Sequence, residues 1–108
     1  MPKVISSLQN PLIKNVLLLG EKPRARKDQN RIVIEGLREI RMAFESGFNI
    51  TYLFYTPGLV ADTALRSLMV EGRHMELIEV STEIFNRMAY RRDSGGLIAL
   101  AIFAFINL

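Results

Sequence analysis

The sequence predicts an α/β domain in which a mostly parallel sheet of about four strands is covered by helices. Apolar residues recur at helical spacing in several segments, and short β-branched or aromatic runs lie between these segments. Glycines and prolines separate the two kinds of segment. Strands that alternate with helices usually form right-handed βα units, which makes the sheet mostly parallel. The chain has 108 residues, the usual length of one domain, and we expect that domain to span residues 1–101.

The first helix is expected to begin at Asn10, a good N-cap residue that is followed by Pro11 at a position where proline is favoured. Val16 and Leu19 then lie at helical spacing. The charged segment 21–30 has no apolar stripe and contains a proline, so we expect a loop with at most one helical turn.

The middle of the chain predicts two strands and two helices. The β-branched run 32–34 is expected to be a strand buried on both faces. A helix begins near Leu37 and is expected to end at Gly47. An aromatic strand follows at 52–55, and a third helix at about 60–71.

The last part of the chain predicts a strand at about 76–80, a helix capped by Ser81, and a final strand at 97–101. Residues 102–106 continue the apolar run, so they are expected to extend the last strand or to pack against another copy of the chain. We expect residues 102–108 to be the start of a truncated linker.

Positive charge is concentrated in the N-terminal part of the chain. Residues 1–41 contain nine Lys or Arg and four Asp or Glu, a net charge of +5. Residues 42–108 contain five Arg and seven acids, a net charge of −2, and the whole chain carries +3. This asymmetry predicts an anion-binding face.

The composition also indicates the cellular compartment in which the protein is expected. The sequence contains no cysteine, which excludes a disulfide framework and a thiolate metal site. No apolar run reaches the roughly 18 to 20 residues that a membrane span needs, and segment 1–15 does not have the pattern of a signal peptide. We therefore expect a cytoplasmic protein with no membrane partner.

A cluster of cations in segment 21–31 is the strongest local signal. Spaced cations on a loop can each neutralise a phosphate, which gives affinity without base specificity. The alternative is a solvated, solubilising loop. The cluster consists of Lys22, Arg24, Arg26, Lys27 and Arg31.

A second candidate is the dipeptide Glu35-Gly36 at a strand–helix junction. Glycine permits a tight turn that exposes helix N-terminal amides, a common anion-binding arrangement. The alternative is that this glycine only ends the strand with a turn. Glu35 ends an apolar strand, so its carboxylate needs a partner, for which Arg31 or Arg38 is available.

Arg91 and Arg92 form a smaller cluster before the last strand. Tyr52, Tyr55 and Tyr90 have faces on which bases could stack, but packing within or beside strands is the alternative interpretation.

Catalytic patterns are missing from the sequence. The sequence contains one histidine, His74, and shows no Ser-His-Asp arrangement. His74 is expected to lie on the surface. No metal site is expected, and these 108 residues alone are not expected to form an enzyme.

The segments ISSLQNPLIKNVLLL and RARKDQNRIVIEGLREIRMAFESG carry a family resemblance. The first contains an S-x-x-N-P-x-I-K opening, and the second leads from a cation-rich stretch to a strand that ends in Glu-Gly. Residues 5–47 thereby resemble the N-terminal substrate-binding domain of the SpoU-type (TrmH-like) RNA 2′-O-ribose methyltransferases. The later segments ITYLFYT and RRDSGGLIALA fit the same pattern more loosely.

The resemblance implies that residues 1–101 form a three-layer α/β/α sandwich, similar to ribosomal protein L30e, that binds RNA. It implies a separate C-terminal domain with a knotted fold, which binds S-adenosylmethionine and methylates a ribose 2′-hydroxyl. No cofactor is therefore expected in this chain. The implied partners are structured RNA (tRNA or rRNA), the chain's own methyltransferase domain and, for the parent protein, a second copy in a homodimer.

The charge pattern and the resemblance together select ten candidate RNA-binding residues, of which Glu35 and Gly36 shape a turn and the others are cations. They are Lys14, Lys22, Arg24, Arg26, Lys27, Arg31, Glu35, Gly36, Arg91 and Arg92.

Two other functions remain open at this point. The chain could be a free-standing L30e-like RNA-binding protein. It could also be a protein-interaction or small-ligand α/β module in which the charge asymmetry is incidental.

Overall fold

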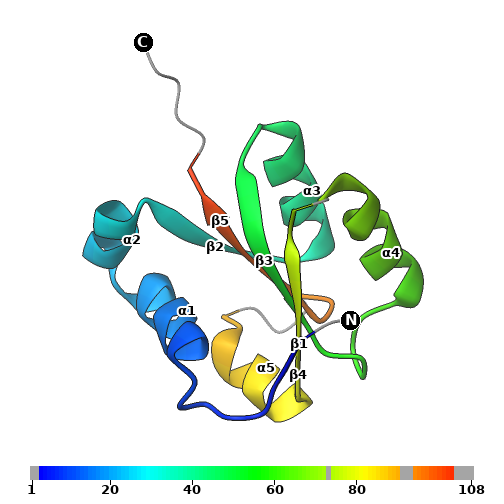
Figure 1. The fold of residues 1–108 in the computed structure, drawn as a ribbon, viewed down its shortest axis with the longest axis horizontal. Coiled ribbons are helices and arrows are strands. Elements are labelled where there is room, and N and C mark those ends of the chain that lie inside the picture. The colour runs from blue at the N-terminus through cyan, green and yellow to red at the C-terminus, as the bar shows by residue number, and fades with distance from the viewer. Residues whose placement is uncertain (1–2, 73, 91–93, 104–108) are drawn as a thin grey trace.

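A computed structural model describes residues 3–72, 74–90 and 94–103. In this part of the chain, five strands form one sheet and five helices pack on its two sides (Figure 1). The elements in chain order are β1 (Lys3–Ile5), α1 (Pro11–Glu21), α2 (Pro23–Gln29), β2 (Arg31–Glu35), α3 (Leu37–Glu45), β3 (Asn49–Tyr55), α4 (Asp62–Glu71), β4 (Glu76–Val80), α5 (Thr82–Met88) and β5 (Leu97–Ile102).

The strand order across the sheet is β1-β4-β3-β5-β2. β4 is parallel to both β1 and β3, whereas β5 is antiparallel to both of its neighbours, β3 and β2. The α/β class is thus confirmed, but a mostly parallel sheet of about four strands is not accurate. The fifth strand is β1, which is too short for a periodic signal, and the wholly apolar β5 is compatible with either direction.

The core lies on both faces of the sheet. Alternate residues of β5 point to opposite sides: Ile98 and Leu100 belong to the apolar cluster under α1 and α5, whereas Leu97, Ala99 and Ala101 belong to the cluster under α3 and α4. Figure 1 shows these two pairs of helices on either side of the strands. The layers are therefore helices, sheet and helices.

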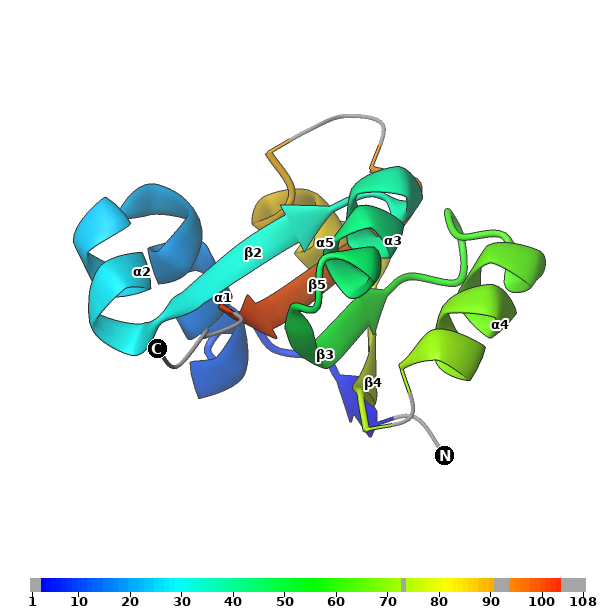
Figure 2. The same ribbon diagram turned by 90° about the horizontal axis from the view of Figure 1, so that it is seen from above.

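β2 is an edge strand, and all five of its residues are half-buried. Its place outside β5 is visible in Figure 2. The prediction that 32–34 is buried on both faces is wrong, because a short β-branched run does not distinguish a central strand from an edge strand. Val33 packs with the cluster under α1, and Ile32 and Ile34 pack with the cluster on the other face.

The predicted helix starts are confirmed at two caps. The Asn10 side chain accepts a hydrogen bond from the backbone N–H of Leu12 at 2.8 Å. The Ser81 hydroxyl accepts one from the backbone N–H of Ile84 at 3.1 Å. Pro11 occupies the first turn of α1, as the sequence predicted.

The segment expected to be a loop contains the helix α2. Pro23 lies in its first turn, and Asn30, in the left-handed conformation with φ 58°, ends it. Reciprocal amide hydrogen bonds between Asn15 and Gln29, at 2.8 and 2.9 Å, attach α2 to α1. Sequence periodicity missed α2 because polar contacts to α1, and not an apolar stripe, hold it in place.

The described part of the C-terminal tail continues the sheet. Ile102 is the last residue of β5 and lies opposite Arg31, and the backbone N–H of Phe103 donates to the carbonyl of Asn30 at 3.1 Å. The boundary expected after residue 101 therefore falls within β5. The rest of the predicted extension, residues 104–106, lies outside the described residues.

The turn before β5 provides a test of the fold. Gly95 and Gly96 both have positive φ, at 64° and 74°. A Cβ on Gly96 would lie 2.7 Å from the backbone nitrogen of Val60, whereas a Cβ on Gly95 has no described atom within 4 Å. Gly95→Ala should therefore lose about 1–2 kcal/mol of unfolding free energy through backbone strain alone.

Gly96→Ala should lose about 2 kcal/mol more than Gly95→Ala, because the 56–61 segment has to move as well. Urea denaturation of both variants measures the difference. Equal losses would mean that the close approach of the two turns does not constrain the fold.

Candidate nucleic-acid interface

Four candidate cations are exposed on α1, on α2 and at the junction between these helices. We refer to Lys14, Lys22, Arg24 and Lys27 as the basic surface. Arg24 and Asp28 are one helical turn apart and form an ion pair at 4.0 Å, with exposed side-chain fractions of 92% and 68%. Such an exposed pair is weak, so the Arg24 guanidinium can exchange Asp28 for another anion.

Arg26 differs from these cations because it binds the protein itself. Its Nη1 donates to the carbonyl of Leu19 at 2.6 Å and lies 3.4 Å from the carbonyl of Gly20. Carbonyls in the last turn of a helix have no partner within the helix, and a cation is favourable there. Arg26 thus caps α1 from α2 and fixes the angle between the two helices.

Arg31 begins β2 and is half-buried. Strand alternation places it on the same face as Val33 and Glu35, which is the face covered by α1 and α5. It therefore lies on the side of the sheet that carries the basic surface.

Glu35, at the other end of β2, accepts a hydrogen bond from the backbone N–H of Tyr90 at 2.8 Å. This contact brings the connection after α5 to the end of β2, a proximity that sequence reasoning could not establish. Arg91 and Arg92 follow Tyr90 in the chain but lie outside the described residues.

Gly36 shapes the turn between β2 and α3, as expected. Its φ of 96° and ψ of 149° form a conformation that is largely restricted to glycine. Its N–H donates to the carbonyl of Leu97 at 3.0 Å, and its carbonyl accepts from Ile40 at 3.0 Å. Gly36 thereby joins the end of β2 to the start of β5.

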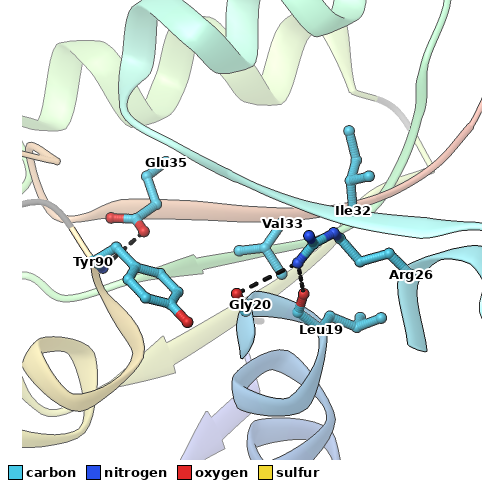
Figure 3. A pocket seen from close by; sticks show the side chains of 7 residues that line it. All are labelled: Leu19, Gly20, Arg26, Ile32, Val33, Glu35 and Tyr90. Atoms are coloured by element: carbon cyan, nitrogen blue, oxygen red, sulfur yellow. Dashed lines mark hydrogen bonds between the residues drawn. The ribbon is translucent and has the colours of Figure 1, made fainter. Parts of the chain in front are cut away.

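A groove of about 310 Å³ lies beside β2 (Figure 3). The C-terminal end of α1, the helix α2 and Tyr90, which follows α5, form the rest of its border. No local sequence pattern indicates this groove, because its residues come from four separate segments of the chain. Its lining consists of Leu19, Gly20, Arg26, Ile32, Val33, Glu35 and Tyr90.

The three tyrosines have different environments. Tyr52 stacks on Phe54 with ring centroids 6.2 Å apart, and Tyr55 is buried. Burial, reinforced by the nearby carboxylate of Glu79, raises the pKa of the Tyr55 phenol. The packing interpretation is confirmed for these two strand residues, whereas Tyr90 is 66% exposed and lies in the groove.

A histidine, metal-binding clusters and membrane-spanning helices are the features that would indicate other functional classes. His74 is exposed, as predicted. Within residues 3–72, 74–90 and 94–103, no group of three or more His, Asp or Glu side chains is placed to hold a metal ion. In the same ranges, no helix combines the length and the apolar character that crossing a bilayer requires.

The fold is an α/β/α sandwich that carries the basic surface on the α1 and α2 side of its sheet. Residues 10–99 match the family model of the MRM3-like substrate binding domain. The chain therefore belongs to the MRM3-like substrate-binding-domain family. No curated protein sequence is similar enough to the chain to count as a relative.

Solved structures of similar fold include RNA methyltransferases. An RNA 2′-O ribose methyltransferase is 30% identical with a TM-score of 0.81, and the match covers 97% of this chain and 39% of that one. An AdoMet-bound rRNA methyltransferase from Sinorhizobium meliloti is 20% identical with a TM-score of 0.70, covering 96% and 38%. The SpoU methyltransferase AviRb from Streptomyces viridochromogenes, in complex with AdoMet, is 18% identical with a TM-score of 0.72, covering 92% and 35%.

The chain thus spans less than two-fifths of the length of these methyltransferases. The family identification confirms the resemblance predicted from residues 5–47. It also agrees with the prediction of a substrate-binding domain.

Arg26 and Arg24 provide a matched pair for testing which cations are structural. Arg26→Ala removes the partner of two α1 carbonyls, so the free energy of unfolding should fall by about 1–2 kcal/mol. Arg24→Ala removes a weak exposed ion pair and should change it by less than about 0.5 kcal/mol. Denaturant titration measures both values, and an Arg26→Ala protein as stable as the wild type would contradict the capping role.

Proposed function

We propose that this chain is the RNA-recognition domain of an S-adenosylmethionine-dependent RNA 2′-O-ribose methyltransferase, and that its basic surface contacts the phosphates of a structured tRNA or rRNA. The observation that carries this proposal is the group of exposed cations on α1 and α2 in a chain whose family is a substrate-binding domain. The related methyltransferases support RNA as the substrate. The L30e-like description of the sandwich belongs to the same proposal.

Each cation of the basic surface can neutralise a phosphate and release its condensed counterion. Lys14, Lys22, Arg24 and Lys27 satisfy the main requirement for this role because they are exposed. Arg31, Arg91 and Arg92 are further candidates, whereas Arg26 supports the surface by holding α2 against α1. Such contacts orient a nucleic acid without reading its sequence.

Methyl transfer requires a part of the protein beyond this chain. The described groove, at about 310 Å³, is at the lower end of the roughly 300–1,000 Å³ typical of ligand pockets. It is open along the edge strand, so it does not fit the enclosed site that a cofactor as large as S-adenosylmethionine needs. We place cofactor binding, ribose methylation and any homodimer contact in the remainder of the parent protein, acting in the cytoplasm.

Calorimetry tests this division between the domains. Titration of the 108-residue chain with S-adenosylmethionine should give no binding in the micromolar range, because no described pocket suits the cofactor. Micromolar affinity would contradict the assignment of this chain to substrate recognition alone.

Charge reversal tests RNA binding directly. The Lys22→Glu, Arg24→Glu, Lys27→Glu variant should retain its thermal stability, because all three side chains are exposed. Its affinity for a structured RNA should fall at least about 100-fold at low salt, because three attractive phosphate contacts become repulsive. If four cations contact phosphate, the wild-type log–log salt slope should be roughly −3 to −4.

The matched control reverses the same number of exposed cations away from the basic surface. Lys3 lies on β1, at the opposite edge of the sheet, and Arg41 and Arg66 lie on α3 and α4, on the opposite face. The Lys3→Glu, Arg41→Glu, Arg66→Glu variant has the same net charge and should bind RNA much more tightly than the first variant. Filter binding at several salt concentrations compares them, and equal affinities would leave the basic surface as a solvated face.

A further inference from the structure

We propose that the groove beside β2 holds one unpaired RNA nucleotide, whose base stacks on Tyr90. The proposal rests on the proposed function, because it assumes that the basic surface brings RNA to this side of the domain. It adds a second kind of contact: the basic surface binds backbone phosphates, whereas the groove binds a base.

The Tyr90 ring is held in place on one side and open on the other. A Cβ added to Gly20 would lie 2.6 Å from Cε2 and 3.3 Å from the hydroxyl of Tyr90, so the ring covers the position where any other residue would have a side chain. The hydrogen bond from the Tyr90 N–H to Glu35 fixes the backbone of the same residue. Even so, Tyr90 is 66% exposed, an unusual state for a positioned aromatic side chain.

The groove has the composition of a base-binding site. Its floor contains the side chain of Val33, with Leu19 at one wall, and Tyr90 and Arg26 lie toward opposite ends in Figure 3. A volume of about 310 Å³ equals the share of about ten water molecules in the liquid, which is more than one base fills. Aromatic side chains stack on bases regardless of base identity, because every base has a π-face.

Charge complementarity selects RNA as the occupant. Arg26 in the groove lining belongs to α2, whose Arg24 and Lys27 are exposed, so the groove meets the basic surface at its Arg26 end. The exposed acid Glu21 lies between Gly20 and Lys22. An RNA strand that runs from a base on Tyr90 along the groove toward Arg26 would therefore bring its next phosphates to the exposed cations of α2. Because paired bases hide their faces in the helix stack, an unpaired base in a loop, bulge or single strand is the form that can enter.

A tryptophan substitution tests the stacking directly. The sequence contains no Trp, so Tyr90→Trp creates a single fluorescent reporter in the groove. A stacked base should quench its emission as an unpaired oligoribonucleotide is added, and a blunt duplex of the same length should quench it far less. Met42→Trp is the matched control, since Met42 is 55% exposed on α3, across the sheet from the groove, and its reporter should not respond.

Affinity measurements on two further variants separate stacking from simple folding effects. Tyr90→Ala should weaken binding of the unpaired oligonucleotide by about 5- to 150-fold, and Tyr90→Phe should retain nearly all of it, because the ring alone provides the stacking. Gly20→Ala should weaken binding by displacing the ring, although alanine in a helix raises intrinsic stability. Circular dichroism checks that each variant remains folded.

The outcomes distinguish the two proposals. RNA binding that depends on the basic surface, with no quenching in Tyr90→Trp and no loss in Tyr90→Ala, would overturn the nucleotide site and leave the proposed function intact. Equal binding and quenching with duplex and unpaired RNA would also overturn it. Absence of any RNA binding by the wild-type chain would overturn both.

Discussion

The arrangement of this domain depends on the burial of β5 between two antiparallel neighbours. β5 pairs with β3 on one side and with β2 on the other, and helices cover both of its faces, so an unpaired polar side chain is unfavourable on either face. Its large residues Ile98 and Leu100 meet α1 and α5, whereas the small residues Ala99 and Ala101 leave space in the cluster that contains Ile40 of α3. Both helical layers therefore pack against the same strand, β5.

The central position of β5 has consequences at the edge of the sheet. Because β5 occupies the place next to β3, β2 is displaced outward and becomes half-buried. Because α1 ends at Glu21, it does not cover the whole of the half-buried strand β2, and part of Val33 stays exposed. This exposed part of β2 is the floor of the groove. Arg26 then closes one end of the groove, since it holds α2 against the last carbonyls of α1. The candidate site is thus a result of sheet order and of one capping contact.

The sequence predicted the elements that apolar periodicity defines and missed those held by polar contacts. The helices after Asn10 and Ser81, and the strands around Leu53 and Ile78, follow from spacing and caps. α2 was missed because the bonds of Arg26 and of the Asn15–Gln29 amides lie between helices, where no local pattern records them. The direction of β5 was missed because a wholly apolar strand fits a parallel or an antiparallel place equally well.

The candidate site shows the same division between local and non-local information. Charge counting found every cation of the basic surface, but it also included Arg26, whose charge is used within the fold. It could not find the groove, because Gly20 and Tyr90 are seventy positions apart and meet only after α1 and α5 pack on the same face.

The closeness of the groove to the basic surface sets a physical limit on what this domain can recognise. Phosphate contacts are blind to sequence, and stacking on Tyr90 discriminates weakly among bases. Glu35, the carboxylate of the groove, already accepts the Tyr90 N–H, so at least part of its bonding capacity is used within the fold. In the proposed complex, selectivity would therefore come mainly from RNA shape, in which an unpaired nucleotide lies at a fixed distance from a phosphate path along α1 and α2. Under the proposed function, such a domain would position an RNA by its secondary structure, which suits a module that presents one nucleotide region to a separate catalytic part.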